Sequence, residues 1–185
     1  MENKFLEKIA KPFNPEIPFA ETMDGYLDQL IPIVRSWGED LWEEKFYVDK
    51  PWLEVRDDEH FHHAVLHFFN EGGEYLKSVD GDVTAGSWRY MPNSNKLIIE
   101  SGMGDAELFD LAFMDAQFFV LQKHGNQERL GERKYFVMVF EPIARRLEWR
   151  DAMLFLFNKY RNNNSFYITV AVIILLIIAI IFTLS

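Results

Sequence analysis

The sequence predicts a mainly β domain with flanking helices, followed by one transmembrane helix at the C-terminal end. Two observations carry this prediction. Between residues 45 and 141, short apolar or aromatic runs alternate with turn residues, and the last part of the chain is a long uncharged apolar stretch. Short connections make consecutive strands antiparallel neighbours. We therefore expect an antiparallel meander of about eight strands, as a small closed barrel or a curled sheet.

The 185 residues divide into five segments of different character. Pro12, Pro15 and Pro18 favour an extended arm over a folded element. Apolar residues then recur at helical spacing and Pro32 interrupts them, so we expect one broken helix or two short ones. In chain order we predict an extended N-terminal arm at 1–19, a helical segment at 20–44, the β-meander at 45–141, a juxtamembrane helix and linker at 142–164, and a transmembrane anchor at 165–185.

Turn residues separate the expected strands. Asp80 and Gly81 give the clearest hairpin signal, since glycine accepts the positive φ that tight turns need. After the last strand, residues 143–160 carry apolar residues with charges on the other side, which predicts a helix that packs on the barrel or lies on the membrane. The expected strands span residues 45–55, 62–69, 74–79, 83–91, 96–101, 107–113, 117–123 and 134–141.

Residues 166–184 form an apolar stretch of 19 residues without charge, proline or glycine. As a helix it would extend about 28 Å, close to the thickness of a bilayer's hydrocarbon core. Phe166 and Tyr167 stand where an interfacial aromatic belt is expected, and Leu175 and Phe182 lie within the predicted anchor. Because the stretch has no ionisable residue, it favours a plain anchor, with a packing helix of a larger membrane complex as the alternative.

The charges around this stretch predict its orientation. Basic residues precede it and only Ser185 follows, so the positive-inside rule places the N-terminal domain in the cytoplasm and the C-terminus outside. The N-terminal residues lack the continuous apolar region of a secretory signal, so we expect a single-pass, tail-anchored protein. The basic residues before the stretch are Arg145, Arg146, Arg150, Lys159 and Arg161.

Composition excludes several classes of function. The formal net charge is -10, which disfavours nucleic acid as a partner because the phosphate backbone would repel the chain. The sequence has no cysteine, so structural disulfides, zinc–thiolate sites, iron–sulfur clusters and thiol catalysis are excluded. No G-x-S-x-G motif or phosphate-binding fingerprint occurs in the sequence. We therefore predict neither an enzyme nor a bound cofactor.

Part of the chain resembles a lipocalin-like family of small bacterial β-barrels. The resemblance covers roughly residues 37–141 and rests on an aromatic strand, a turn before Tyr75, a G-x-W pattern in a central strand, and a polar turn before an aliphatic strand. It implies a lipocalin-like barrel able to hold one small ligand. The matching positions here are Gly73, Tyr75, Gly86, Trp88 and 93–95.

Aromatic residues of the predicted strands are the candidates for a ligand cavity. Phenylalanine and tryptophan inside a barrel would suit an apolar or lipid ligand, whereas the more common arrangement is a packed core. The candidate residues are Trp88, Tyr90, Phe109, Phe113, Phe119 and Phe136.

Histidines at the start of the second expected strand are the candidates for a metal site. His60 and His62 would point to one face of a strand, as would His63 and His67, and H-x-H on a strand can hold zinc. A third ligand would come from His124 or a carboxylate. The alternative is a solvated strand start with scattered histidines.

Three functions follow from these features. The first is a non-enzymatic, membrane-tethered interaction domain, an accessory or regulatory subunit of a membrane complex at the cytoplasmic face, with integral membrane proteins as partners. The second is a lipocalin-like carrier of an apolar or lipid ligand at the membrane. The third is a metal-dependent enzyme that uses the histidines between residues 60 and 67.

Overall fold

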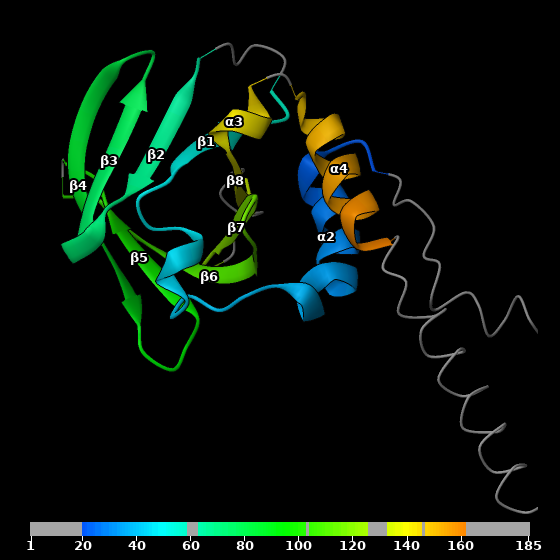
Figure 1. The fold of residues 1–185 in the computed structure, drawn as a ribbon, viewed down its shortest axis with the longest axis horizontal. Coiled ribbons are helices and arrows are strands. Elements are labelled where there is room, and N and C mark those ends of the chain that lie inside the picture. The colour runs from blue at the N-terminus through cyan, green and yellow to red at the C-terminus, as the bar shows by residue number, and fades with distance from the viewer. Residues whose placement is uncertain (1–19, 59–62, 103, 126–132, 146, 162–185) are drawn as a thin grey trace, which may run out of the picture.

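The computed structural model describes residues 20–58, 63–102, 104–125, 133–145 and 147–161. Helices α2 and α4 lie side by side against one wall of the strands (Figure 1). Within the described residues the helices are α2 (Met23–Val34), α3 (Glu141–Ala144) and α4 (Trp149–Arg161), with short 3-10 helices η2 (Arg35–Trp37), η3 (Glu44–Phe46) and η4 (Glu71–Gly73). The strands are β1 (Pro51–Val55), β2 (Val65–Phe69), β3 (Glu74–Val79), β4 (Asp82–Met91), β5 (Lys96–Glu100), β6 (Ala106–Met114), β7 (Phe118–Lys123) and β8 (Tyr135–Phe140).

The eight strands form a closed, all-antiparallel barrel. Each strand pairs with the next along the chain, and β1 pairs with β8, with Trp52 opposite Phe140. The predicted mainly β meander is therefore confirmed, and its form is the barrel, because a curled sheet would leave its first and last strands unpaired. At the β3–β4 hairpin, Asp80 and Gly81 have φ values of 50° and 101°, as a tight turn requires.

One end of the barrel, the closed end, is filled by aromatic side chains. Trp52, Phe69 and Phe119 are fully buried there, since alternate residues of each strand point to the barrel axis. Tyr47 enters from the segment before β1: its ring centroid lies 5.2 Å from that of Phe119, and its hydroxyl donates to the Leu41 carbonyl at 2.9 Å. The segment before β1 therefore crosses the barrel end, whereas the sequence predicted a first strand beginning at residue 45.

A second apolar cluster lies outside the barrel, between its wall and the helices. Leu30 of α2 and Met153 of α4 are fully buried against outward-facing side chains of β6, β7 and β8. A β-bulge shifts the register of β6 between Leu111 and Phe113, which places Leu111 inside the barrel and Phe113 in the outer cluster. Packing on the barrel is thus the arrangement of α4 in the described structure.

Local sequence explains how the helices begin and end. Thr22 caps α2, because its hydroxyl accepts the Gly25 N–H at 3.2 Å. Helix α2 continues through Pro32, whose ring is exposed to solvent, and η2 follows directly. The single helix predicted at 143–160 is instead divided, because α3 contacts β1 and β8 while α4 turns to run along α2.

Some predicted segments lie outside the described residues. They are the arm at 1–19, His60 and His62, and the predicted span with Phe166, Tyr167, Leu175 and Phe182. Among the residues that the structure does describe, no helix is long and apolar enough to cross a membrane.

Candidate ligand-binding site

A cavity of about 460 Å³ lies inside the barrel at the end opposite the closed end. We call it the mouth cavity, because residues of the β5–β6 turn and Arg133, just before β8, form its rim. Its volume lies in the range of pockets that hold small molecules. Three side chains form an apolar wall, namely Ile99, Phe109 and Phe136. The charged lining residues are Glu54, Arg56, Lys77, Asp105, Glu107, Lys123 and Arg133.

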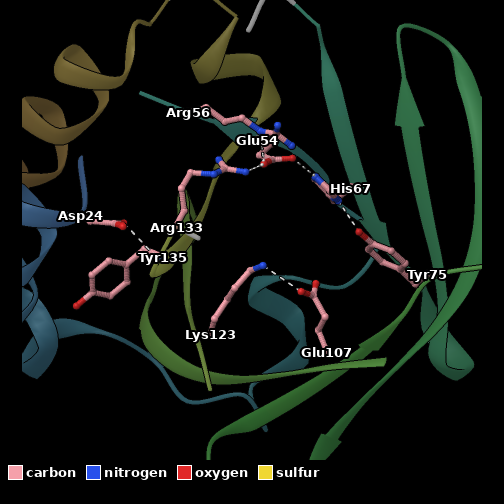
Figure 2. Close-up of polar contacts among 9 residues, drawn as sticks. All are labelled: Asp24, Glu54, Arg56, His67, Tyr75, Glu107, Lys123, Arg133 and Tyr135. Atoms are coloured by element: carbon pink, nitrogen blue, oxygen red, sulfur yellow. Dashed lines mark hydrogen bonds and ion pairs between the residues drawn. The ribbon is translucent and has the colours of Figure 1, made fainter. Parts of the chain in front are cut away.

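Three buried polar side chains cross the base of this cavity: Glu54, His67 and Tyr75 (Figure 2). His67 Nε2 lies 3.2 Å from Glu54 Oε2, and His67 Nδ1 lies 2.5 Å from the Tyr75 hydroxyl. Glu54 and His67 come from the neighbouring strands β1 and β2, and Tyr75 comes from β3. All three point inward: Glu54 lies two positions after the core residue Trp52, His67 lies two positions before Phe69, and Tyr75 is itself part of the aromatic core.

The pKa shifts assign the protons in this chain of hydrogen bonds. Burial would raise the pKa of Glu54, but hydrogen bonds from His67 and Arg56 lower it to about 2, so Glu54 is an ionised acceptor. Burial lowers the pKa of the His67 imidazole, and burial raises that of the Tyr75 hydroxyl, so both are neutral near pH 7. His67 therefore donates from Nε2 to Glu54 and accepts the Tyr75 proton at Nδ1.

The cations of the mouth cavity are not all neutralised by its carboxylates. Arg56 Nε lies 2.6 Å and Arg133 Nη2 lies 3.3 Å from Glu54 Oε1. Lys123 Nζ lies 3.0 Å from Glu107 Oε1. The ammonium group of Lys77, which is half-buried, makes no hydrogen bond or ion pair with the part of the chain that the structure describes. Although the protein is acidic, cationic side chains outnumber carboxylates in the lining of the mouth cavity. Lys77 is the lining cation that remains available to pair with an anionic ligand.

The predicted aromatic site residues do not line one cavity. Phe109 and Phe136 border the mouth cavity, whereas Trp88 and Phe119 belong to the packed closed end. Tyr90 borders a different pocket, at the closed end, and Phe113 lies outside the barrel. The bulge in β6 explains Phe113, because one extra residue reverses the face to which the following side chain points.

The sequence pointed to His67 as a candidate metal ligand and to Tyr75 through the resemblance, but Glu54, Lys77 and Lys123 were not predicted as site residues. Glu54 follows Trp52 by two positions, Lys77 follows Tyr75 by two, and Lys123 follows Leu121 by two. A charged residue in phase with inward apolar residues is the signal that would have found them, since it must lie inside a barrel or at its rim.

The described histidines do not form a metal site. His67 is buried in the barrel, whereas the exposed His63 contacts Asp80 at the β3–β4 turn. His124 Nδ1 lies 2.8 Å from Asp110 Oδ2. No group of three or more potential ligands that could hold a metal ion occurs among the residues described by the structure, and His60 and His62 are not among them.

The structure agrees with the resemblance only at the level of architecture. An eight-stranded antiparallel barrel is compatible with the lipocalin-like fold that the resemblance implied. In comparisons with known proteins, no family model, no curated protein and no solved structure matches this chain.

Proposed function

We propose that this protein is a non-enzymatic binding module, a lipocalin-like barrel that takes up a small anionic molecule at its open end and is tethered by the predicted C-terminal span. The observation that carries the proposal is Lys77, a half-buried residue that lines the mouth cavity and whose ammonium group makes no ion pair with the described residues. A cation without an ion-pair partner inside a cavity is stabilised by an anionic ligand.

The remaining lining residues define the ligand further. Phe109, Phe136 and Ile99 offer an apolar wall beside the charged groups. A ligand that has one anionic group and one ring or short apolar part would satisfy both surfaces. This chemistry differs from a wholly apolar lipid, which would leave the Lys77 charge uncompensated.

The buried polar chain favours binding over catalysis. Both ring nitrogens of His67 already have partners, Glu54 and Tyr75. The imidazole cannot accept a proton from a ligand without losing the Tyr75 hydrogen bond, so its role here is to position Tyr75 and Glu54. Participation in a complex with integral membrane proteins stays a prediction.

Binding of a fluorescent anion tests the proposal. The probe is 1-anilinonaphthalene-8-sulfonate, which combines a sulfonate with aromatic rings. Full-length protein is kept in a mild detergent at a concentration at which the probe does not partition into the micelles, and it should bind the probe. Lys77→Met should weaken this binding about tenfold, equivalent to about 1.4 kcal/mol. Lys45→Met is the control. Lys45 is exposed at the closed end, away from the mouth cavity, so its replacement should leave the affinity for the probe unchanged.

A neutral analogue separates charge from size. N-phenyl-1-naphthylamine has the same rings without the sulfonate, so Lys77→Met should change its affinity less than twofold. Equal losses for the two probes would mean that Lys77 acts by packing rather than by charge. Equal affinity of wild type and Lys77→Met for the sulfonate would refute the proposed site.

A further inference from the structure

Aromatic and sulfur-containing side chains are exposed on the closed end of the barrel. Trp42 is 72% exposed, Met91 is 40% exposed and Trp37 is 38% exposed. Trp42 and Met91 border a second pocket of about 400 Å³, and Trp37 lies a few residues earlier in the chain. We call the surface formed by these three residues the closed face. Exposed tryptophan is uncommon on a soluble surface and is enriched at membrane interfaces.

Helix α4 ends beside the closed face. The Tyr160 ring stacks on Trp37 with centroids 5.6 Å apart. Lys159 Nζ lies 2.7 Å from Asp115 Oδ2, in the β6–β7 turn. From Trp37 the chain continues across the same end of the barrel, where the Glu39 N–H donates to the Met114 carbonyl at 2.8 Å. In Figure 1 the orange end of α4 and the cyan segment after α2 lie at the same end of the molecule.

The sequence brings the predicted span close to this face. Four residues, 162–165, separate the end of α4 from the apolar stretch at 166–184. Even fully extended, these residues reach no more than about 17 Å. If 166–184 crosses a bilayer as predicted, the lipid headgroups lie within reach of the closed face, and the mouth cavity lies at the far end of the barrel.

The pocket on the closed face has the chemistry of a site for an alkylammonium group. It is bordered by the Trp42 and Tyr90 rings and by Asp40, whose Oδ1 accepts a 2.6 Å hydrogen bond from Asn95 Nδ2. Aromatic faces attract cations, and a carboxylate beside them adds to the attraction. Glu39, Asp40, Glu43 and Glu44 surround Trp42 in the sequence, so anionic headgroups would be repelled.

We propose that the closed face rests on a membrane of zwitterionic phospholipids, with the pocket at Trp42, Tyr90 and Asp40 receiving the ammonium of a lipid headgroup. The bilayer is the partner, and the mouth cavity then opens toward the aqueous phase. The anionic ligand of the proposed function would therefore arrive from solution rather than from the lipid.

Fluorescence quenching in vesicles tests the contact. Full-length protein is reconstituted into phosphatidylcholine vesicles that contain a lipid with a nitroxide on its headgroup. The nitroxide should quench the tryptophan emission of wild type, and Trp42→Phe should remove at least half of the quenched signal. Trp149→Phe is the control, because Trp149 begins α4 at the opposite end of that helix. Since Trp42 is mostly exposed, its replacement leaves the core intact.

Two results would overturn the proposal. One is a full-length protein that does not float with phosphatidylcholine vesicles. The other is quenching that is equally reduced by Trp42→Phe and Trp149→Phe, or reduced by neither. A separate series tests the lipid class. Replacing phosphatidylcholine stepwise by phosphatidylglycerol, whose headgroup has no ammonium, should lower the quenching of Trp42. Unchanged or increased quenching would show that the ammonium group is not what the face contacts.

Discussion

The hydroxyl of Tyr75 donates a 2.5 Å hydrogen bond to Nδ1 of His67, and this contact joins β3 to β2 inside the barrel. His67 is 2% exposed and Tyr75 is 4% exposed, so both side chains are buried. This bond requires the His67 tautomer with its proton on Nε2. Glu54 sets that tautomer, because its ionised carboxylate accepts the Nε2–H hydrogen bond on the other side of the ring.

Removing the Tyr75 hydroxyl should destabilise the barrel. Tyr75→Phe leaves the buried Nδ1 of His67 without a donor, which costs about 1–2 kcal/mol of unfolding free energy. Urea unfolding followed by circular dichroism measures the change. Tyr90→Phe is the matched control: the Tyr90 hydroxyl has no hydrogen-bond partner among the described residues, so its loss should change stability by less than about 0.5 kcal/mol. Equal effects would contradict the assigned hydrogen bond.

The Glu54 carboxylate should contribute stability that acid removes. Its folded pKa of about 2 lies below its ordinary value of 4.5, so the contribution is present above pH 4.5 and is lost as the pH falls toward 2. Glu54→Gln should lower stability by about 2 kcal/mol at pH 7 and flatten this acid dependence. Urea midpoints between pH 7 and pH 2.5 provide the measurement. Glu43→Gln, at an exposed ion pair, should leave the acid profile as in wild type.

His67 should stay neutral where an ordinary histidine is protonated. Its pKa is lowered by burial, so near pH 6.5 the unfolded chain takes up a proton more readily than the folded protein does. Stability should therefore fall as the pH drops through 6.5, before the Glu54 effect begins. Nitrogen NMR of the imidazole should show a neutral ring with the proton on Nε2 at pH 6. A ring protonated at that pH would refute the assignment.

Asp115 should hold the end of α4 to the barrel. Its Oδ1 accepts the N–H groups of Gln117 and Phe118 at 2.7 and 2.8 Å, and its Oδ2 accepts Lys159 and Tyr160 at 2.7 and 2.5 Å. Asp115→Ala should cost about 2–3 kcal/mol and speed amide exchange in the last turn of α4. Lys159→Met removes the ion pair and the 2.7 Å hydrogen bond from Lys159 Nζ to Gln117 Oε1, but it keeps the other bonds of Asp115, so it should cost less than Asp115→Ala. Unchanged exchange in Asp115→Ala would show that apolar packing alone holds this helix end.

The bulge in β6 predicts different roles for two phenylalanines of one strand. Phe109→Ala should alter binding of the anionic probe, because Phe109 borders the mouth cavity. Phe113→Leu should cost about 1–2 kcal/mol of stability and leave probe affinity unchanged, because Phe113 packs outside against the helices. A change in affinity caused by Phe113→Leu would place that side chain inside the barrel instead.

Much of the fold could be predicted because local patterns specify it. Apolar or aromatic runs between turn residues predicted the strands at 74–79, 96–101 and 134–141, and the D-G pair predicted the hairpin that joins β3 to β4. Residues 45–50 were predicted as strand and instead close the barrel end, because Tyr47 packs among aromatic residues distant in sequence. Closure itself depends on pairing between β1 and β8, which no local pattern encodes.

By itself, the sequence determined the mainly β meander, the flanking helices and the acidic, cysteine-free character of the chain, since hydrophobic period, turn chemistry and composition are local properties. Only the tertiary structure decided the site. Glu54, His67 and Tyr75 come from three strands, and Lys77 lacks a counter-charge only because of the neighbours that the barrel gives it. Burial and pairing are properties of residues brought together in space, so sequence spacing alone does not contain them.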